Sequence, residues 1–235
     1  MKFKEWTNTM VNTKDIICRC TDPTGLDADN LIYPLGCHNN FYNFKNNNNT
    51  DIFTNHSDVN TKLLFYSFSS STDRNRKIII NQKSMNTRKE LTRQDYKNIL
   101  DKNYKMTQYS GEDYYKNIGK YKFNISPSGN GLDCFRHYET WVSKGIPIIE
   151  YNSFIEKKYN MLPILWTNDY SNINDNYLNS QYQKFLDKDY DFRRLLLTQY
   201  SNKIQNEIKI ICKNQYMTAL GLRTKQFWNF SDYFK

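Results

Sequence analysis

The residues best suited to chemistry lie between Ser126 and Glu139, in the sequence SPSGNGLDCFRHYE. A run of small residues that joins a strand to a helix leaves the first N–H groups of the helix facing the loop. Gly129 and Gly131 permit backbone angles and close approaches that side chains forbid. Because a loop of this kind at a helix N-terminus attracts anions, we expect it to bind a diphosphate.

Charged side chains follow this loop at regular spacing. Asp133, Arg136 and Glu139 recur every three residues, so on a helix they are expected to share one face. Arg136 lies one turn into the predicted helix, where a guanidinium can fork onto phosphate oxygens. Glu139 lies one turn deeper, at the distance of a ribose. The alternative interpretation is a solvated stripe of charged residues with no ligand.

Two common nucleotide-binding motifs are absent from the loop. A Walker A loop needs the sequence GKS or GKT, which the loop lacks, and a GxGxxG fingerprint needs a third glycine where Cys134 stands. These differences disfavour P-loop and dinucleotide chemistry.

The surrounding pattern alternates between strands and helices. Continuous apolar runs predict strands over 63–68, 121–126, 146–150 and 164–167, and a shorter strand over 15–20. Helices are expected over 75–81, 93–102, 112–118, 133–144 and 173–186, with Gly145 ending the fourth. This order predicts an α/β fold with a Rossmann-like, mostly parallel sheet and helices on both faces.

Three regions are expected along the 235 residues. Residues 1–61 form an irregular N-terminal segment or a reduced acceptor lobe, and residues 62–190 form the Rossmann-like domain. Residues 191–235 form a helical tail, in which Ile204, Ile208 and Ile211 make one apolar stripe that packs on that domain.

Composition narrows the class of protein. The net charge is +9, and residues 62–122 hold 14 Lys and Arg against 6 Asp and Glu, which suits a phosphorylated ligand or a nucleic acid. Abundant Asn, Lys, Ile and Tyr are also typical of A/T-rich genomes, which would raise the lysine count without such a ligand.

Five scattered cysteines without a CxxC pair indicate reduced thiols rather than a disulfide framework or a zinc site. With no apolar segment long enough to span a membrane and no secretory signal, we expect a cytoplasmic protein.

The segment ISPSGNGLDCFRHYETWVSKGIPII resembles the donor-binding segment of exostosin-like glycosyltransferases and their viral and bacterial relatives. That family has the approximate pattern F-x-I-S-P-x-G-N-G-x-D-C-x-R-x-W-E-x-L-x-x-G-x-I-P-I-V. The residues that match it are Phe123, Ile125, Ser126, Pro127, Gly129, Asn130, Gly131, Asp133, Cys134, Arg136, Glu139, Gly145, Pro147 and Ile148. The resemblance extends over about residues 60–180 and includes Thr72 and Arg76. The chain departs from the pattern at Phe135 and at His137-Tyr138, where relatives often have His and Thr-Trp.

The resemblance implies a metal-independent glycosyltransferase of the GT-B type. The donor would be a nucleotide-sugar, with a UDP-sugar favoured, and the acceptor a hydroxyl of a glycan or protein. No further cofactor is implied, and a viral member would act in the host cytoplasm. The implied donor-binding residues are Ser126, Ser128, Gly129, Asn130, Gly131, Asp133, Arg136, Glu139 and Arg76.

The acceptor side is less determined by the sequence. Enzymes of this type place it in a separate N-terminal domain, whereas only about sixty residues precede the recognisable half. Either residues 1–61 form a reduced lobe, or a second chain, in a homo-oligomer or from a partner, completes it. His38 is the preferred catalytic base, and the rivals are His56, Asp15, Asp22 and Asp58. A protein of another class, non-catalytic and nucleic-acid-binding or structural on a glycosyltransferase-like fold, remains the alternative.

Overall fold

A sheet of four parallel strands forms the centre of the molecule. The computed structural model describes residues 1–11, 16–17, 35–38, 40–41, 44, 59–70, 91–128 and 133–210. The strands are β1 (Lys62–Phe65), β2 (Tyr121–Ile125), β3 (Ile146–Glu150) and β4 (Leu165–Thr167), and they lie in the order β1-β2-β3-β4. Neighbours pair in register, as Phe123 with Ile146 and Ile148 with Leu165 show. The predicted parallel α/β sheet is therefore confirmed.

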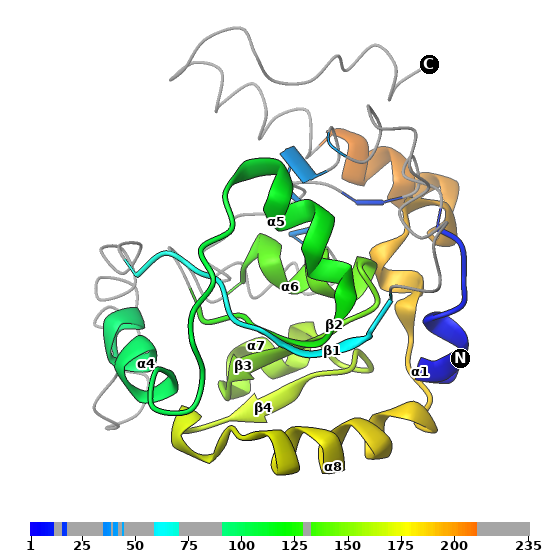
Figure 1. Ribbon diagram of the computed structural model, residues 1–235. Coiled ribbons are helices and arrows are strands. Elements are labelled where there is room, and N and C mark those ends of the chain that lie inside the picture. The colour runs from blue at the N-terminus through cyan, green and yellow to red at the C-terminus, as the bar shows by residue number, and fades with distance from the viewer. Residues whose placement is uncertain are drawn as a thin grey trace, which may run out of the picture.

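Helices cover both faces of this sheet (Figure 1). α5 (Gly111–Asn117) and α6 (Phe135–Val142) lie on one side, and α8 (Asp175–Leu186) lies on the other. Further α-helices in the described part are α1 (Phe3–Trp6), α4 (Arg93–Leu100), α7 (Ser153–Lys158) and residues 202–210, and residues 40, 41 and 44 are also helical. Short 3-10 turns occur at Ile118–Lys120, Tyr170–Asn172, Phe192–Leu195 and Leu197–Gln199. The predicted helix over 75–81 lies outside the described residues.

Local signals explain why helices start where they do. Thr92 caps α4 by accepting from the Asp95 N–H, and the Asp95 carboxylate accepts from the Thr92 N–H at 2.8 Å. This reciprocal pair satisfies two backbone donors of the first turn. Asn174 caps α8 by accepting from the Tyr177 N–H at 3.0 Å. Both caps lie within two residues of the predicted helix starts.

The helix predicted over 133–144 is shorter than expected. α6 spans Phe135–Val142, because its N-cap Cys134 is extended and Lys144 takes a positive φ of 68°. Gly145 was predicted to end the helix, yet the left-handed residue is Lys144. Gly145 meets a different requirement, since a Cβ there would lie 3.0 Å from Asn124 Nδ2 and 3.2 Å from the Tyr121 carbonyl oxygen. The turn after α6 thus packs directly on β2.

The main core crosses the predicted region boundaries. Phe3 and Trp6 are buried in the same cluster as Phe123 and Ile148 of the sheet, and Phe192 belongs to it too. Trp6 stacks on Phe192 with ring centroids 4.3 Å apart. The described residues at both ends of the chain therefore pack on the sheet as one body.

A second, smaller cluster holds the tail. Ile208 is buried with Ile17 and Leu197, and Ile204 packs against them, while Ile211 lies outside the described residues. Of the strand predicted over 15–20 only Ile16 and Ile17 are described, and Ile16 forms an isolated antiparallel bridge with Leu196. The described part of the stripe therefore packs on Ile17 and Leu197, in a cluster separate from the core of the sheet, and its predicted packing on residues 62–190 stays a prediction.

Candidate functional site

The candidate site lies at the two described ends of the segment that joins β2 to α6. Arg93 holds the first of these ends, which follows β2. The Arg93 guanidinium is buried and donates to three backbone carbonyl oxygens: Ser128 and Pro127, each at 2.9 Å, and Ser69 at 3.0 Å. It also lies 5.8 Å from the centre of the Phe68 ring. Because Ser69 follows β1 and Ser128 follows β2, Arg93 ties together the segments that leave two neighbouring strands.

Ser128 meets a carboxylate on its other side. The Ser128 N–H and hydroxyl donate to the same oxygen, Oε2 of Glu150 at the end of β3, at 3.1 and 3.3 Å. Ser128 is 4% exposed, whereas Glu150 is half-buried. Ser126, just after β2, is fully buried, and its Oγ has no hydrogen-bond partner among the described residues. Gly129, Asn130, Gly131 and Arg76 lie outside the described residues.

The other end of the loop is held by a buried ion pair. Lys158 Nζ, at the end of α7, lies 2.7 Å from Asp133 Oδ2, and both side chains are almost fully buried. The hydroxyls of Tyr138 and Tyr159 also donate to the Asp133 carboxylate. Asp133 precedes α6 and faces inward, so the expectation that it shares a helical face with Arg136 and Glu139 is wrong. The carboxylate has the contacts of an anchor for the end of the loop.

His137 connects the two ends of the loop. It is fully buried, and its Nε2 lies 3.0 Å from the Ser126 carbonyl oxygen while its Nδ1 lies 2.7 Å from the Tyr159 hydroxyl. Burial lowers the pKa of His137 to about 3, so the ring is neutral at pH 7. Since a carbonyl only accepts, Nε2 carries the proton and Nδ1 accepts. His137 Nδ1 and the Asp133 carboxylate therefore compete for the single proton of the Tyr159 hydroxyl.

Arg136 and Glu139 share a partner that the sequence did not reveal, Tyr114 of α5. Arg136 Nε donates to the Tyr114 hydroxyl at 3.3 Å, and that hydroxyl donates to Glu139 Oε2 at 3.1 Å. The guanidinium also lies 5.7 Å from the centre of the Tyr114 ring. Burial raises the pKa of Glu139 to about 7, against the opposing effect of Arg136. Glu139 is 4% exposed, which excludes a fully solvated stripe.

His38 lies against the same helix. Its backbone N–H donates to Glu139 Oε1 at 3.3 Å, and its ring meets the edge of Phe135 with centroids 5.1 Å apart. His38 Nδ1 accepts from the Asn40 N–H at 3.1 Å, which favours the tautomer with its proton on Nε2. The structure thus brings His38 next to Glu139 and Arg136. The rival bases His56, Asp15, Asp22 and Asp58 lie outside the described residues.

Several residues that build the site were missed by sequence reasoning. Glu150 had a usable signal, because it ends a predicted strand at the edge where the loop also emerges. Arg93, Tyr114 and Lys158 had none, since their contacts depend on how distant helices pack. Within the described residues no three His, Cys, Asp or Glu side chains are grouped to hold a metal ion, and no helix is long and apolar enough to cross a membrane.

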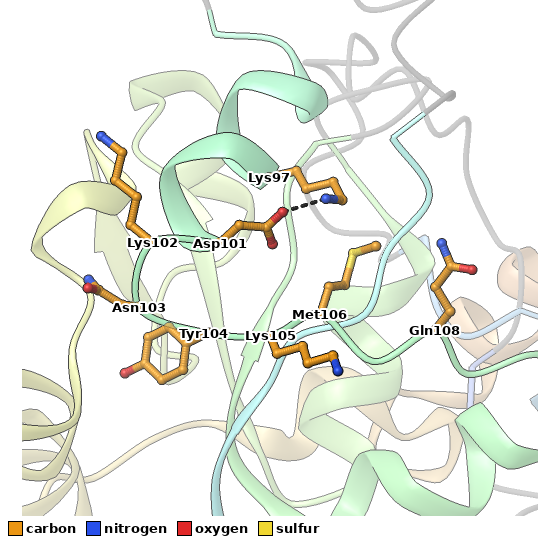
Figure 2. A pocket seen from close by; sticks show the side chains of 8 residues that line it. All are labelled: Lys97, Asp101, Lys102, Asn103, Tyr104, Lys105, Met106 and Gln108. Carbon is orange, nitrogen blue, oxygen red and sulfur yellow. Dashed lines mark hydrogen bonds and ion pairs between the residues drawn. The ribbon is translucent and has the colours of Figure 1, made fainter.

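A separate hollow lies at the end of α4 (Figure 2). Its volume is about 560 Å³, and it is lined by Lys97, Asp101, Lys102, Asn103, Tyr104, Lys105, Met106 and Gln108. Lys97 pairs with Asp101, which also accepts from the Tyr66 hydroxyl at 2.8 Å. Three lysines against one aspartate make this surface basic.

Comparison with known proteins adds no family assignment. No protein-family model matches the chain, and no curated protein matches it.

Proposed function

We propose that the chain is a glycosyltransferase that moves a sugar from a nucleoside-diphosphate sugar, most simply a UDP-sugar, to an acceptor hydroxyl. The observation that carries the proposal is that Arg136 and Glu139 of α6 share the Tyr114 hydroxyl, while the His38 backbone N–H donates to Glu139, on the helix that follows the segment leaving β2. In parallel α/β sheets, ligands bind outside the carboxyl ends of the strands, which is where this loop begins.

The proposed chemistry requires a cation near the leaving group. Transfer breaks the bond between the sugar C1 and the diphosphate oxygen, so negative charge grows on the diphosphate. Arg136 is the second residue of α6 and donates to the Tyr114 hydroxyl, and we assign it the role of the cation that stabilises this charge. Preorganised donors of this kind contribute about 3 kcal/mol to transition-state stabilisation.

Glu139 is proposed to accept hydrogen bonds from the ribose hydroxyls. Its two oxygens already accept from the His38 N–H and the Tyr114 hydroxyl. A carboxylate oxygen has two lone-pair sites, so each retains one acceptor position. The proposal therefore assigns Glu139 to the ribose hydroxyls, with Tyr114 fixing the carboxylate.

The acceptor proton needs a base, and His38 suits that role in only one of its neutral forms. In the tautomer that the Asn40 contact favours, Nε2 donates, and His38 would contact the diphosphate rather than deprotonate the acceptor. His38→Ala distinguishes the two roles by the pH profile of transfer. Loss of the ionisation on the acidic side of the profile supports a base, whereas an unchanged profile with weaker binding of the nucleotide-sugar supports a hydrogen-bond donor.

The decisive experiment measures binding of nucleoside diphosphates and hydrolysis of nucleotide-sugars. UDP and GDP are compared with short oligonucleotides by thermal melting, because a ligand specific for the folded state raises the midpoint. Arg136→Ala should remove the effect of the nucleotide, whereas Arg193→Ala, an exposed arginine paired with Asp191, should retain it. No shift with any nucleotide or nucleotide-sugar contradicts the proposal.

A second candidate function, polyanion binding, is favoured by the basic hollow at the end of α4 (Figure 2). Lys102 and Lys105 are exposed there, and such lysines suit phosphates of a nucleic acid backbone. This function would replace the first proposal if oligonucleotides, but not nucleotides, raise the melting midpoint. The double substitution Lys102→Glu with Lys105→Glu should then abolish the increase.

A further inference from the structure

Ser128 has charged hydrogen-bond partners of both signs, an arginine and a carboxylate. Its carbonyl oxygen, and that of Pro127 before it, accept from Arg93 at 2.9 Å each. Its N–H and hydroxyl both donate to Glu150 Oε2, at 3.1 and 3.3 Å. Acceptors are therefore turned to one side of Ser128 and donors to the other, and Arg93 fixes that orientation.

Two donors that converge on one anionic oxygen make a subsite for an oxyanion. A carboxylate oxygen and a phosphate oxygen accept the same short, charge-assisted hydrogen bonds. Because Ser128 is 4% exposed, its donors would lose free energy if they were left without an acceptor. If the Glu150 oxygen leaves the Ser128 N–H and hydroxyl, another anionic oxygen must therefore take its place.

Glu150 is the least buried member of this arrangement. It is the last residue of β3 and half-buried, whereas Arg93 and Ser128 are buried. Ser126, two residues before Ser128, adds a buried Oγ at the same end of β2 that has no hydrogen-bond partner within the described part of the chain.

We infer that Ser128 forms a phosphate subsite which Glu150 occupies in this structure, and that an incoming diphosphate displaces the Glu150 carboxylate. The inference rests on the proposed function for the nature of the ligand. Glu150 then sets the specificity of the loop, because only a group that accepts at least as well as a carboxylate replaces it. Neutral ligands are excluded by the same competition.

The test measures binding of inorganic pyrophosphate by calorimetry to the full chain. Glu150→Gln keeps the size of the side chain but removes its charge, so pyrophosphate affinity should rise about tenfold, as loss of a charge-assisted competitor predicts. Glu156→Gln is the matched control, since this exposed residue on α7 carries the same charge and should leave affinity unchanged. Ser128→Ala should lower affinity about tenfold or more.

Unchanged or weaker pyrophosphate binding by Glu150→Gln would overturn the inference, as would equal gains with Glu156→Gln. If Glu150→Gln does not fold, a crystal of the unmodified chain soaked with pyrophosphate gives the answer. A phosphate oxygen on the Ser128 N–H with Glu150 turned away is expected, and a phosphate bound while Glu150 keeps Ser128 contradicts it.

The outcomes also separate this inference from the proposed function. A tighter pyrophosphate complex with no preference for a nucleoside diphosphate supports the subsite and removes the glycosyltransferase proposal. A nucleoside diphosphate that binds the unmodified chain and Glu150→Gln equally well keeps that proposal and overturns the inference.

Discussion

The ion pair between Lys158 and Asp133 gives the sharpest test of the structure. The Lys158 side chain is 5% exposed, that of Asp133 is fully buried, and their charged atoms lie 2.7 Å apart. Replacing Lys158 with Met keeps the volume but leaves the Asp133 carboxylate buried, with the tyrosine hydroxyls as its only donors among the described residues. Breaking a buried pair by removing one partner costs about 3–5 kcal/mol, and the tyrosines favour the lower end, about 3 kcal/mol.

The measurement is the free energy of unfolding from urea denaturation, followed by tryptophan fluorescence. In a chain of this length, a loss of about 3 kcal/mol lowers Tm by roughly 6–12 °C. Lys157→Met is the control, since the neighbouring lysine of α7 is exposed and its loss should change stability by at most about 0.5 kcal/mol. Asp133→Asn combined with Lys158→Met should recover part of the loss, because no uncompensated charge then remains. Equal losses from Lys158→Met and Lys157→Met would refute the reasoning.

Three further predictions concern α6. Arg136→Ala should weaken nucleoside diphosphate binding by about 1.5–3 kcal/mol in calorimetry; a large drop in Tm without ligand would make Arg136 structural instead. Glu139 has its pKa raised from 4.5 to about 7, so the stability it contributes is present below pH 4.5 and is lost as the pH rises through 7. Glu139→Gln should abolish this loss, which reaches up to about 1.4 kcal/mol per pH unit, in urea denaturation as a function of pH. His137 has its pKa lowered from 6.5 to about 3, so the stability that it contributes to the fold is present above pH 6.5 and is lost as the pH falls towards 3. His137→Gln should reduce the dependence of the unfolding free energy on pH between 6.5 and 3. An unchanged dependence would mean that the ring is charged in the folded protein.

The sequence predicted the sheet because buried parallel strands are continuous apolar runs. β3 matches its predicted range, Ile146–Glu150, since Gly145 marks its start and every residue before Glu150 is buried. β1 was predicted to reach Phe68 but ends at Phe65. The run continues for another reason: Tyr66 and Phe68 are buried outside the sheet, the first bonded to Asp101 and the second under Arg93. An apolar run indicates which residues are buried, and here the buried residues continue after the pairing of β1 with β2 has ended.

The site was predicted in part. Spacing alone correctly grouped Arg136 with Glu139, because i and i+3 positions of a helix share a face. It placed Asp133 with them, since nothing in the local sequence shows that the helix begins only at Phe135. The residue that turns Asp133 inward, Lys158, comes 25 positions later on another helix. Long-range ion pairs of this kind have no local spacing to detect.

Charge balance around the loop links these observations. In the described part of the chain, three cations, Arg93, Arg136 and Lys158, and three carboxylates, Glu150, Glu139 and Asp133, take part in the contacts around the ends of the loop. Three cations and three carboxylates leave no excess positive charge for a diphosphate. Asp133 is fixed by its ion pair, so only the other two carboxylates can adjust. In the proposed displacement Glu150 leaves Ser128, and Glu139, with a pKa of about 7, can take a proton near neutral pH. If a diphosphate binds as proposed, its favourable field comes from the displacement of one carboxylate and the protonation of another.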